Sequence, residues 1–222
     1  MNLSEKTFNL LKNFSSINQS ILFKQGNTLR TMSVMKNILA EADIEEDIPQ
    51  DFAIYDLVRF LNGISLFEEP ELDFTNDSHL TIRDGKSKRT KYFFADPSVI
   101  VAPPEKSIEL PSEDVTFTLD SNNLIQLLKA SAVYGLPDLS AVGEAGVVKL
   151  VIRDKKNDTS DDFSIIVGET DKVFSFNFKI ENIKILPGTY KVDISEKLLS
   201  RFVNESHNLT YYIALEPDST FG

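Results

Sequence analysis

The side chains that most often carry chemistry are few in this chain. It contains no cysteine, which excludes disulfides, thiolate catalysis, iron–sulfur clusters and cysteine-ligated zinc. Its two histidines, His79 and His207, follow short polar stretches typical of surface turns, and neither has the spacing of a metal ligand. No G-x-S-x-G, P-loop or G-x-G-x-x-G motif is present. The sequence therefore predicts a protein that is not an enzyme and that uses no metal and no cofactor.

The charge of the chain is concentrated in one segment. The net charge is −11 over 222 residues, and residues 41–77, with twelve acids and the single base Arg59, carry −11 on their own. Residues 83–91 have the opposite sign, with five bases against Asp84. Each run by itself is typical of a solvated surface. An acidic chain also argues against a simple nucleic-acid-binding surface, which is normally basic overall.

The helices and strands that would position any site are predicted in the same order in both halves of the chain. Helical patterns at 4–14 and 121–134 are each followed by three strand-like runs, at 20–24, 28–34 and 38–44 and at 139–144, 147–154 and 163–167. A second helical stretch follows in each half, at 56–67 and, cut short by Pro187-Gly188, near 180–183. Residues 92–95 and 211–214 match at an offset of 119. The chain thus predicts two similar domains.

A connector separates the two copies. Residues 96–114 contain four prolines, which exclude a regular helix and favour an extended, semi-rigid segment. The apolar Val99-Ile100-Val101 in its middle either packs on the sheets or borders a groove, and both readings are compatible. No apolar run approaches the roughly 18 residues that a membrane span needs, and the first residues are already amphipathic. We expect a soluble cytoplasmic protein.

In this arrangement the chain resembles the DNA sliding clamps of T-even-type bacteriophages over nearly its whole length. The stretches that carry the resemblance are 10–14 with Ile17-Asn18, 53–57, 95–98, 101–103, 214–216 and 218–220. The resemblance implies an α+β DNA-clamp fold, with two similar domains that each pack two helices on antiparallel sheet and assemble into a ring. The implied boundaries are 1–95, a connector at 96–114, and 115–222. The basic 83–91 loop and the loops 157–162 and 196–205 depart from the family pattern.

The resemblance also implies a function and partners. A sliding clamp encircles duplex DNA without reading its sequence and tethers the replicative DNA polymerase. A ring of six domains requires a homotrimer of this two-domain chain, opened by a separate clamp-loader ATPase. Transcription factors are a further candidate partner, and the place of action is the cytoplasm of the phage host.

Three sets of site residues follow from mapping the family onto this sequence. The helices considered together carry a net charge of +3 in a chain of −11, which suits weak attraction to phosphate. The DNA-facing candidates are Lys6, Asn9, Lys12, Asn13, Arg59, Asn62, Asn122, Gln126, Lys129, Lys179 and Lys184. The partner-peptide pocket candidates are Ile100, Val101, Pro103, Tyr212, Ala214, Leu215 and Pro217, with Met32 and Ile38 as further contributors. The subunit-interface candidates are Arg89, Lys91, Phe93, Asp161, Phe163 and Ile165, where the basic loop before one strand would meet Asp158, Asp161 and Asp162 before the other.

Two alternative functions remain open at this point. The acidic run at 41–77 is compatible with an acidic DNA-mimic protein that occupies the DNA groove of a nuclease or repressor, and this predicts competition with DNA. A non-enzymatic phage structural or assembly protein of sandwich type would instead be incorporated into virions.

Overall fold

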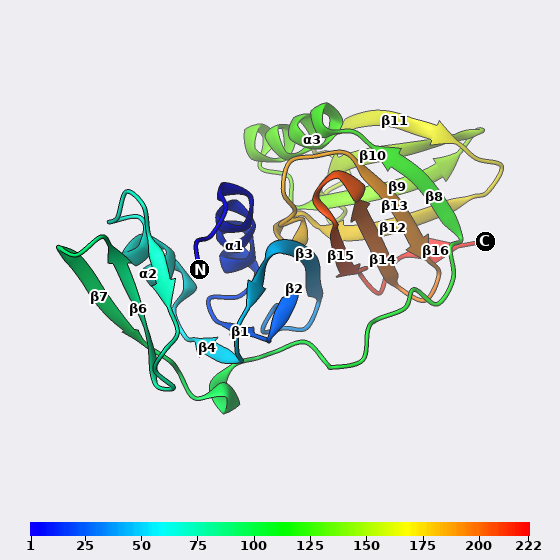
Figure 1. Ribbon diagram of the computed structural model, residues 1–222. Helices are drawn as coiled ribbons and strands as arrows, with labels where there is room; N and C mark the ends of the chain where they lie inside the picture. The colour runs from blue at the N-terminus through cyan, green and yellow to red at the C-terminus, as the bar shows by residue number, and fades with distance from the viewer. The chain divides into compact units, whose positions relative to one another are not determined.

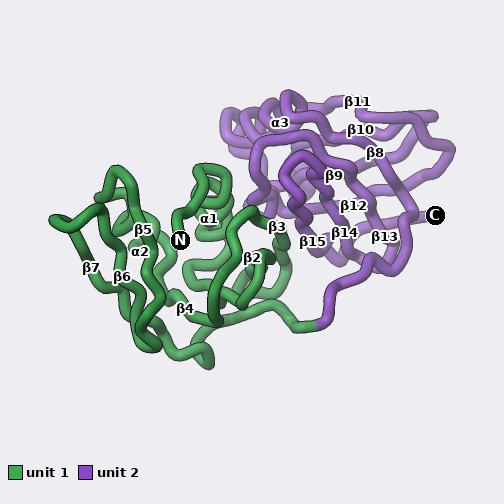
Figure 2. Tube along the Cα trace, in the orientation of Figure 1, with its two compact units in different colours: residues 1–105 green, residues 106–222 purple.

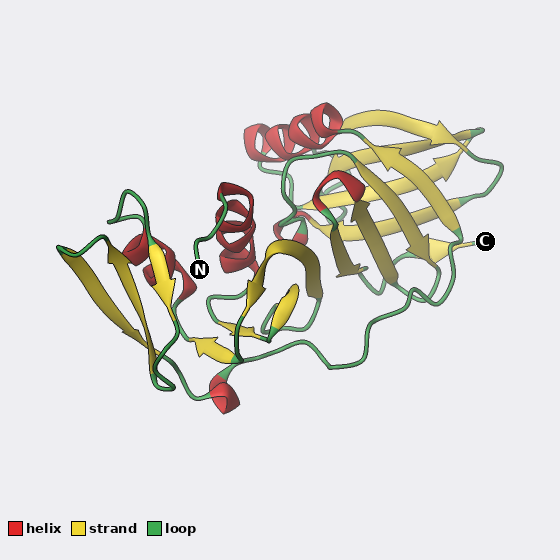
Figure 3. Cartoon of the chain, viewed as in Figure 1, coloured by secondary structure: helices red, strands yellow, loops and turns green.

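The computed structural model describes residues 1–222 and divides the chain into two compact units, Met1–Glu105 and Lys106–Gly222 (Figure 1 and Figure 2). The division falls inside the proline-rich segment 96–114, while the domain boundaries inferred from the sequence remain a prediction. Both units mix helices with antiparallel strands (Figure 3). No helix combines the length and apolar character that a membrane crossing requires.

The first unit follows the predicted order of helix, strands, helix and strands. Its elements are α1 (Glu5–Ile17), β1 (Ile21–Phe23), β2 (Gly26–Met32), β3 (Ile38–Ile48), β4 (Phe52–Ile54), α2 (Leu57–Ile64), β5 (Glu71–Asp73), β6 (His79–Asp84), β7 (Lys88–Phe93) and the 3-10 turn η1 (Pro97–Val99). The turn η1 is the one helical piece in the connector, where Pro97 occupies a first-turn position that needs no N–H donor.

The second unit repeats this order after one additional strand. Its elements are β8 (Val115–Leu119), α3 (Ser121–Tyr134), β9 (Asp138–Glu144), β10 (Val147–Arg153), β11 (Phe163–Glu169), β12 (Phe174–Lys179), η2 (Ile180–Asn182), β13 (Tyr190–Ser195), β14 (Leu199–Asn204), η3 (Glu205–His207), β15 (Leu209–Ala214) and β16 (Thr220–Phe221). The predicted second helix of this unit is only the 3-10 turn η2. Its N-cap position is Lys179, which supplies no side-chain cap, and Pro187 follows closely.

All strand pairing within the units is antiparallel. In the first unit β1 pairs with β4, β2 pairs with β3, and β5, β6 and β7 form a three-stranded sheet. In the second unit one sheet runs β11-β10-β9-β12-β16, and β15, β14, β13 and β8 pair in that order. β7 and β11 each have a strand neighbour on one side only. Each unit therefore ends in an edge whose backbone groups are available for pairing.

Side-chain caps explain where the α-helices begin. The hydroxyl of Ser4 accepts a hydrogen bond from the Thr7 N–H at the start of α1. In the same way the Asp56 carboxylate accepts from the Arg59 N–H, and the Asp120 carboxylate accepts from the Asn123 N–H. Ser4 is thus the N-cap of α1. α3 ends at Gly135, whose φ of 67° lies in the left-handed region that glycine adopts without strain.

Two sequence interpretations were wrong at the level of single side chains. His79 is not in a surface turn: it begins β6, is 8% exposed, and its ring lies 5.1 Å from that of Phe93. The polar residues 76–78 make the turn, and the next residue is already in the sheet. On a helical wheel of residues 121–134, Ile125 falls on the apolar side with Leu124 and Leu127. In the structure it is about half exposed, because α3 buries only a narrow stripe that includes Leu124 and Leu127.

Candidate functional site

The polar faces of the α-helices are accessible. On α1, Lys6, Asn9 and Lys12 are exposed and Asn13 is half-buried. The remaining exposed candidates are Arg59 and Asn62 on α2 and Asn122, Gln126 and Lys129 on α3. The opposite side of each helix is buried in its unit. The exposed helix faces therefore present amides and cations to solvent.

Two further cations of the DNA-facing set are placed differently. The Nζ atom of Lys179 donates to the buried carboxylate of Asp138 at 2.6 Å, and this hydrogen bond raises the pKa of the lysine. Lys184 is half-buried in the segment that follows η2. The charge of Lys179 is thus largely committed to its own unit, a role that the sequence spacing did not indicate.

The start of the connector packs on the first unit and also borders a groove. The Asn18 side-chain amide donates to the carbonyl of Val101 at 3.2 Å, and Arg30 Nη1 donates to that of Pro104 at 2.7 Å. A groove of about 360 Å³ lies beside these contacts, lined by Leu22, Lys24, Arg30, Ala102, Pro103 and Glu105. Of the apolar segment, Ile100 is buried and Val101 is bonded to Asn18, so it packs on the first unit, and the groove is bordered by the residues that follow it, Ala102, Pro103 and Glu105.

The partner-pocket candidates are divided between the two units. In the first, Ile100 is buried, while Val101 and Pro103 are half-buried. In the second, Tyr212 and Ala214 lie on the more open face of β15, Leu215 is buried, and Pro217 is exposed. Met32 and Ile38 are buried and do not line the groove.

Sequence reasoning missed Leu22, Lys24 and Arg30 as groove residues. Leu22 and Arg30 occupy half-buried positions that alternate with buried ones along β1 and β2. This alternation is the signal that could have placed them on the open face of the strands.

The edge strands β7 and β11 are open along their whole length. No residue of β7 or β11 is fully buried, and Phe93 and Ile166 are 65% and 61% exposed. Of the interface candidates, Arg89, Lys91 and Asp161 are exposed, whereas Phe163 and Ile165 are half-buried. A large apolar side chain that is open to water on an unpaired edge is typical of an interaction surface.

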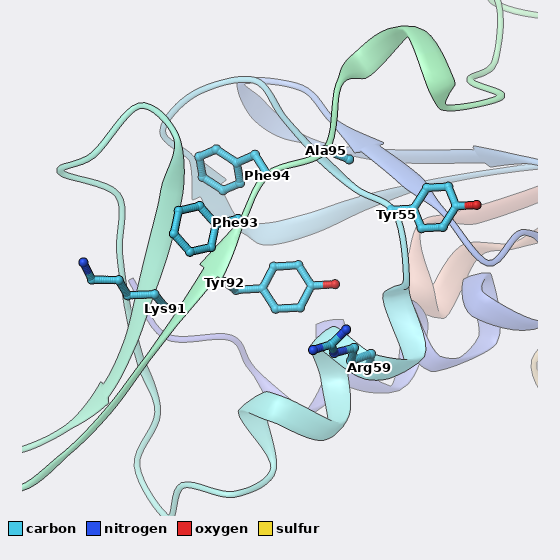
Figure 4. Close-up of a pocket in the computed structure, with 7 residues that line it drawn as sticks. All are labelled: Tyr55, Arg59, Lys91, Tyr92, Phe93, Phe94 and Ala95. Carbon is cyan, nitrogen blue, oxygen red and sulfur yellow. The ribbon is translucent and has the colours of Figure 1, made fainter.

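A pocket of about 350 Å³ lies beside β7 in the first unit (Figure 4). Its lining comes from residues 91–95, from Tyr55 and from Arg59 of α2. The Tyr92 ring points toward Arg59, and its hydroxyl donates to the Asp56 carbonyl at 3.0 Å. The pocket therefore combines an aromatic wall with cationic side chains.

The acidic run is partly structural. Glu46 accepts hydrogen bonds from the Ser4 N–H and from the Thr7 hydroxyl, and Asp51 lies 2.8 Å from Lys24 Nζ. Arg83 pairs with both Glu71 and Asp73. Several of these carboxylates are thus paired within their own unit, which differs from the continuous acidic surface that a DNA mimic needs.

The fold resembles that of the eukaryotic and archaeal clamps. The crystal structure of Proliferating Cellular Nuclear Antigen from Entamoeba histolytica matches with a TM-score of 0.70 at 16% identity, and covers 95% of this chain and 94% of the other. A structure titled "C-terminal region of FEN-1 bound to A. fulgidus PCNA" gives 0.69 at 14% identity, over 96% of each chain. At these identities the likeness establishes the clamp fold, as predicted, and not the function.

Sequence comparisons establish the family. The model described as DNA polymerase processivity factor matches residues 3–102, and that described as gp45 sliding clamp, C terminal, matches residues 116–217. The sliding clamp of Vibrio phage KVP40 is 36% identical over 97% of this chain and 99% of its own length. Those of Escherichia phage RB69 and Enterobacteria phage T4 are 36% and 34% identical over 99% of both chains. The chain therefore belongs to the family of phage sliding clamps, the non-enzymatic processivity factors of DNA polymerases.

Proposed function

We propose that three copies of this chain close into a ring of six similar domains, through which duplex DNA passes while the polymerase stays attached. Membership of the family already makes the chain a processivity factor that acts with a DNA polymerase on DNA. The observation that supports the ring is that β7 in the first unit and β11 in the second lie at sheet edges and carry the exposed apolar side chains of Phe93 and Ile166. A head-to-tail contact between two such edges closes a ring when the rotation per copy allows it.

The exposed helix faces suit a duplex that must slide. Phosphate contacts dominate affinity for DNA and carry no sequence information. A few lysines among neutral amides, as with Lys6, Lys12 and Lys129, attract the duplex weakly and leave it mobile. The excess of acid elsewhere in the chain disfavours binding of DNA to other surfaces.

The partners follow from the same proposal. The connector groove and the β15 tail receive apolar anchors of the polymerase and of an ATP-driven loader, which is a separate protein. Transcription factors that use either of these two surfaces are a further candidate. Since the DNA of a phage is copied inside its host, the place of action is the host cytoplasm.

The first experiment is the native mass by light scattering over a dilution series. A species near 75 kDa, three times the 25.0 kDa of one chain, supports the ring. A stable dimer contradicts it, because four domains cannot close a six-domain ring. The loaded protein should then stay on circular DNA and leave linear DNA through its ends. A DNA mimic would instead compete with DNA for its target protein. A virion component would not stimulate a polymerase.

Reversing the charge of the helix lysines tests whether DNA lies against the exposed helix faces. Replacing Lys6, Lys12 and Lys129 by Glu is expected to lower retention on circular DNA at least tenfold, since attraction to phosphate becomes repulsion. The matched control reverses three exposed lysines outside the helices, Lys36, Lys106 and Lys156. Equal losses in both triple variants, with both still trimeric, would contradict the assignment of these helix faces to DNA.

Truncating Tyr212 tests the partner surface. Tyr212→Ala is expected to weaken binding of the cognate polymerase by at least tenfold while the trimer mass is unchanged, because a half-buried aromatic anchor is lost. Tyr134→Ala, which removes an exposed tyrosine of α3, is the control. Unchanged affinity of the Tyr212 variant would remove this residue from the partner surface.

A further inference from the structure

The hairpin of β6 and β7 carries cations that its own unit does not use. They are exposed and lie in the turn or along β7: Lys86, Lys88, Arg89 and Lys91. None of them has a carboxylate within ion-pair distance. Asp84 is the one acid in the basic run, and its carboxylate accepts a hydrogen bond from the Glu68 N–H. Unpaired like charges this close together repel one another, and an anion from outside the chain would relieve the repulsion.

Two of these cations lie on the face of the sheet that is turned away from α2. Tyr92 lies on the covered face, because its ring is 5.1 Å from that of Phe60 in α2. Side chains alternate along a strand, so Arg89 and Lys91 lie on the opposite, outer face, while Lys88 shares the side of Tyr92. Figure 4 shows Lys91 and Tyr92 directed to opposite sides of β7. DNA that lies against α2 is therefore separated from Arg89 and Lys91 by the sheet.

The outer face already contains one arginine that is bound by carboxylates. Arg83 of β6 donates through Nε and Nη2 to the two carboxylate oxygens of Glu71, at 2.9 and 3.1 Å. Its Nη1 atom lies 3.6 Å from Asp73. Arg89 lies directly opposite Arg83 but has no carboxylate of its own. A carboxylate supplied to Arg89 would repeat the two-point contact that Glu71 makes with Arg83.

We propose that the outer face of this hairpin binds an acidic, extended segment of a partner protein that has carboxylates at alternate residues. Arg89 and Lys91 are two residues apart on one face, a separation of about 6.8 Å along the strand. An extended polypeptide has the same repeat, so alternate residues of the segment place one carboxylate at each cation. Lys86, in the turn, extends the row beyond Arg89.

This inference goes beyond the ring proposed above, because the surface belongs to one unit. Strand pairing at an edge uses backbone groups in the plane of the sheet. Arg89 and Lys91 project from the face of the sheet, so pairing along the edge of β7 leaves their side chains directed to solvent.

The surroundings of the cations favour a polypeptide over DNA. Glu71 and Asp73 of β5 lie on the same face, two strands away from β7, which is about 10 Å. Arg83 can neutralise only one of them, and residues 68–69, just before β5, add two exposed acids. A duplex carries one charge per about 1.7 Å of its axis and would lay phosphates over these acids as well. A single extended segment along β7 contacts the cations alone.

The test measures binding of two fluorescent probes of equal charge to the full chain. One probe is a peptide in which glutamate and serine alternate, and the other is a single-stranded thymidine oligonucleotide. Fluorescence anisotropy at low ionic strength gives both dissociation constants. We expect the glutamate peptide to bind about tenfold more tightly than the oligonucleotide, and than a control peptide with glutamine in place of glutamate.

A matched pair of variants locates the bound peptide. Lys91→Gln removes a charge from the outer face and should weaken peptide binding about fivefold. Lys88→Gln removes the same charge from the other face of the same strand and should leave the affinity within about twofold. Combining Arg89→Gln with Lys91→Gln should weaken binding about twentyfold. The native mass of each variant, measured by light scattering, should equal that of the parent chain.

Disulfide trapping gives an independent position for the peptide, because the chain has no cysteine of its own. Thr81→Cys lies directly opposite Lys91 on the outer face, and Ser65→Cys lies at the exposed end of α2. Both variants are treated with glutamate and glutamine peptides that end in a cysteine. The glutamate peptide should react about tenfold faster than the glutamine peptide with Thr81→Cys, because binding raises its local concentration, and at an equal rate with Ser65→Cys.

The other outcomes overturn the inference. Equal weakening by Lys91→Gln and Lys88→Gln would show attraction by net charge and not by the outer face. Tighter binding of the oligonucleotide would make nucleic acid the ligand of this surface. A parent chain that binds no peptide at low ionic strength, while light scattering reports a trimer, would remove this surface and leave the ring in place.

Discussion

The two units contain the same cross-strand pair in different surroundings. In β5 and β6 of the first unit, Glu71 lies opposite Arg83, and their side chains are 48% and 44% exposed. In β13 and β14 of the second, Asp193 lies opposite Arg201, and the Asp193 side chain is 0% exposed. The same acid–arginine pairing is thus a solvated contact in one unit and a buried one in the other. The buried carboxylate has lost its water and depends entirely on protein donors.

The donors around Asp193 compensate for that loss. Burial opposes its ionisation, yet hydrogen bonds from Arg201 and Thr116 outweigh burial and hold its pKa below the usual value. For Glu71 the hydrogen bond from Arg83 lowers the pKa while water still reaches the carboxylate. Burial, and not the identity of the pair, decides how much each interaction contributes.

Removing the buried charge should give the largest effect. Asp193→Asn leaves Arg201 and Lys191 without their shared carboxylate and should lower the free energy of unfolding by about 3 kcal/mol. Glu71→Gln should leave it unchanged within error, because an exposed ion pair contributes little. Urea unfolding followed by circular dichroism measures both variants. Equal losses in the two would show that burial does not separate the pairs.

Two tyrosines differ in burial in the same way and should give effects of intermediate size. Tyr211 is fully buried, and its hydroxyl accepts from the Leu186 N–H at 3.1 Å, whereas the half-buried Tyr92 donates to the Asp56 carbonyl at 3.0 Å. Tyr211→Phe should cost about 1–2 kcal/mol, since a partly buried N–H loses an acceptor that lies in the core. Tyr92→Phe should cost less, because water can replace the hydroxyl. Urea unfolding measures both variants, and a larger loss of unfolding free energy for Tyr92→Phe than for Tyr211→Phe would contradict the role assigned to burial.

The smallest effect concerns pH in the first unit. Burial raises the pKa of Glu46, but hydrogen bonds from the Ser4 N–H and the Thr7 hydroxyl outweigh it and leave the pKa lowered. A lowered folded pKa contributes stability above the ordinary value of 4.5, and this contribution is lost as pH falls through the folded pKa. Between pH 6 and about 3, the unfolding temperature should therefore decrease less steeply for Glu46→Gln than for the parent. Parallel curves would show that Glu46 does not contribute.

Much of the fold could be predicted from the sequence because its signals are local. The predicted helix at 121–134 is confirmed residue for residue, since Asp120 caps its start and Gly135 ends it. The strand-like runs at 147–154 and 38–44 correspond to β10 and β3, because alternating apolar side chains mark a half-buried strand. The short stretch near 180 kept the apolar pattern but lacked a cap, and only a 3-10 turn formed.

The candidate sites were harder to predict, because their properties depend on contacts distant in sequence. No local pattern indicates that Lys179 is bound to Asp138, 41 residues away. The groove residues Leu22 and Arg30 come from different strands and meet only against the connector. The exposed residues of α1 and α3 could be predicted, since a helical wheel depends on spacing alone.

The two-fold repeat, the absence of thiol chemistry, the connector and the membership of the clamp family can be read from the amino-acid sequence alone, because each depends on composition or on order along the chain. The packed chain was needed to show which strands lie at sheet edges, which carboxylates are buried, and where pockets lie beside α2 and the connector. These properties arise when segments far apart in the chain are packed together and water is excluded between them, and neither packing nor burial is encoded at any single position.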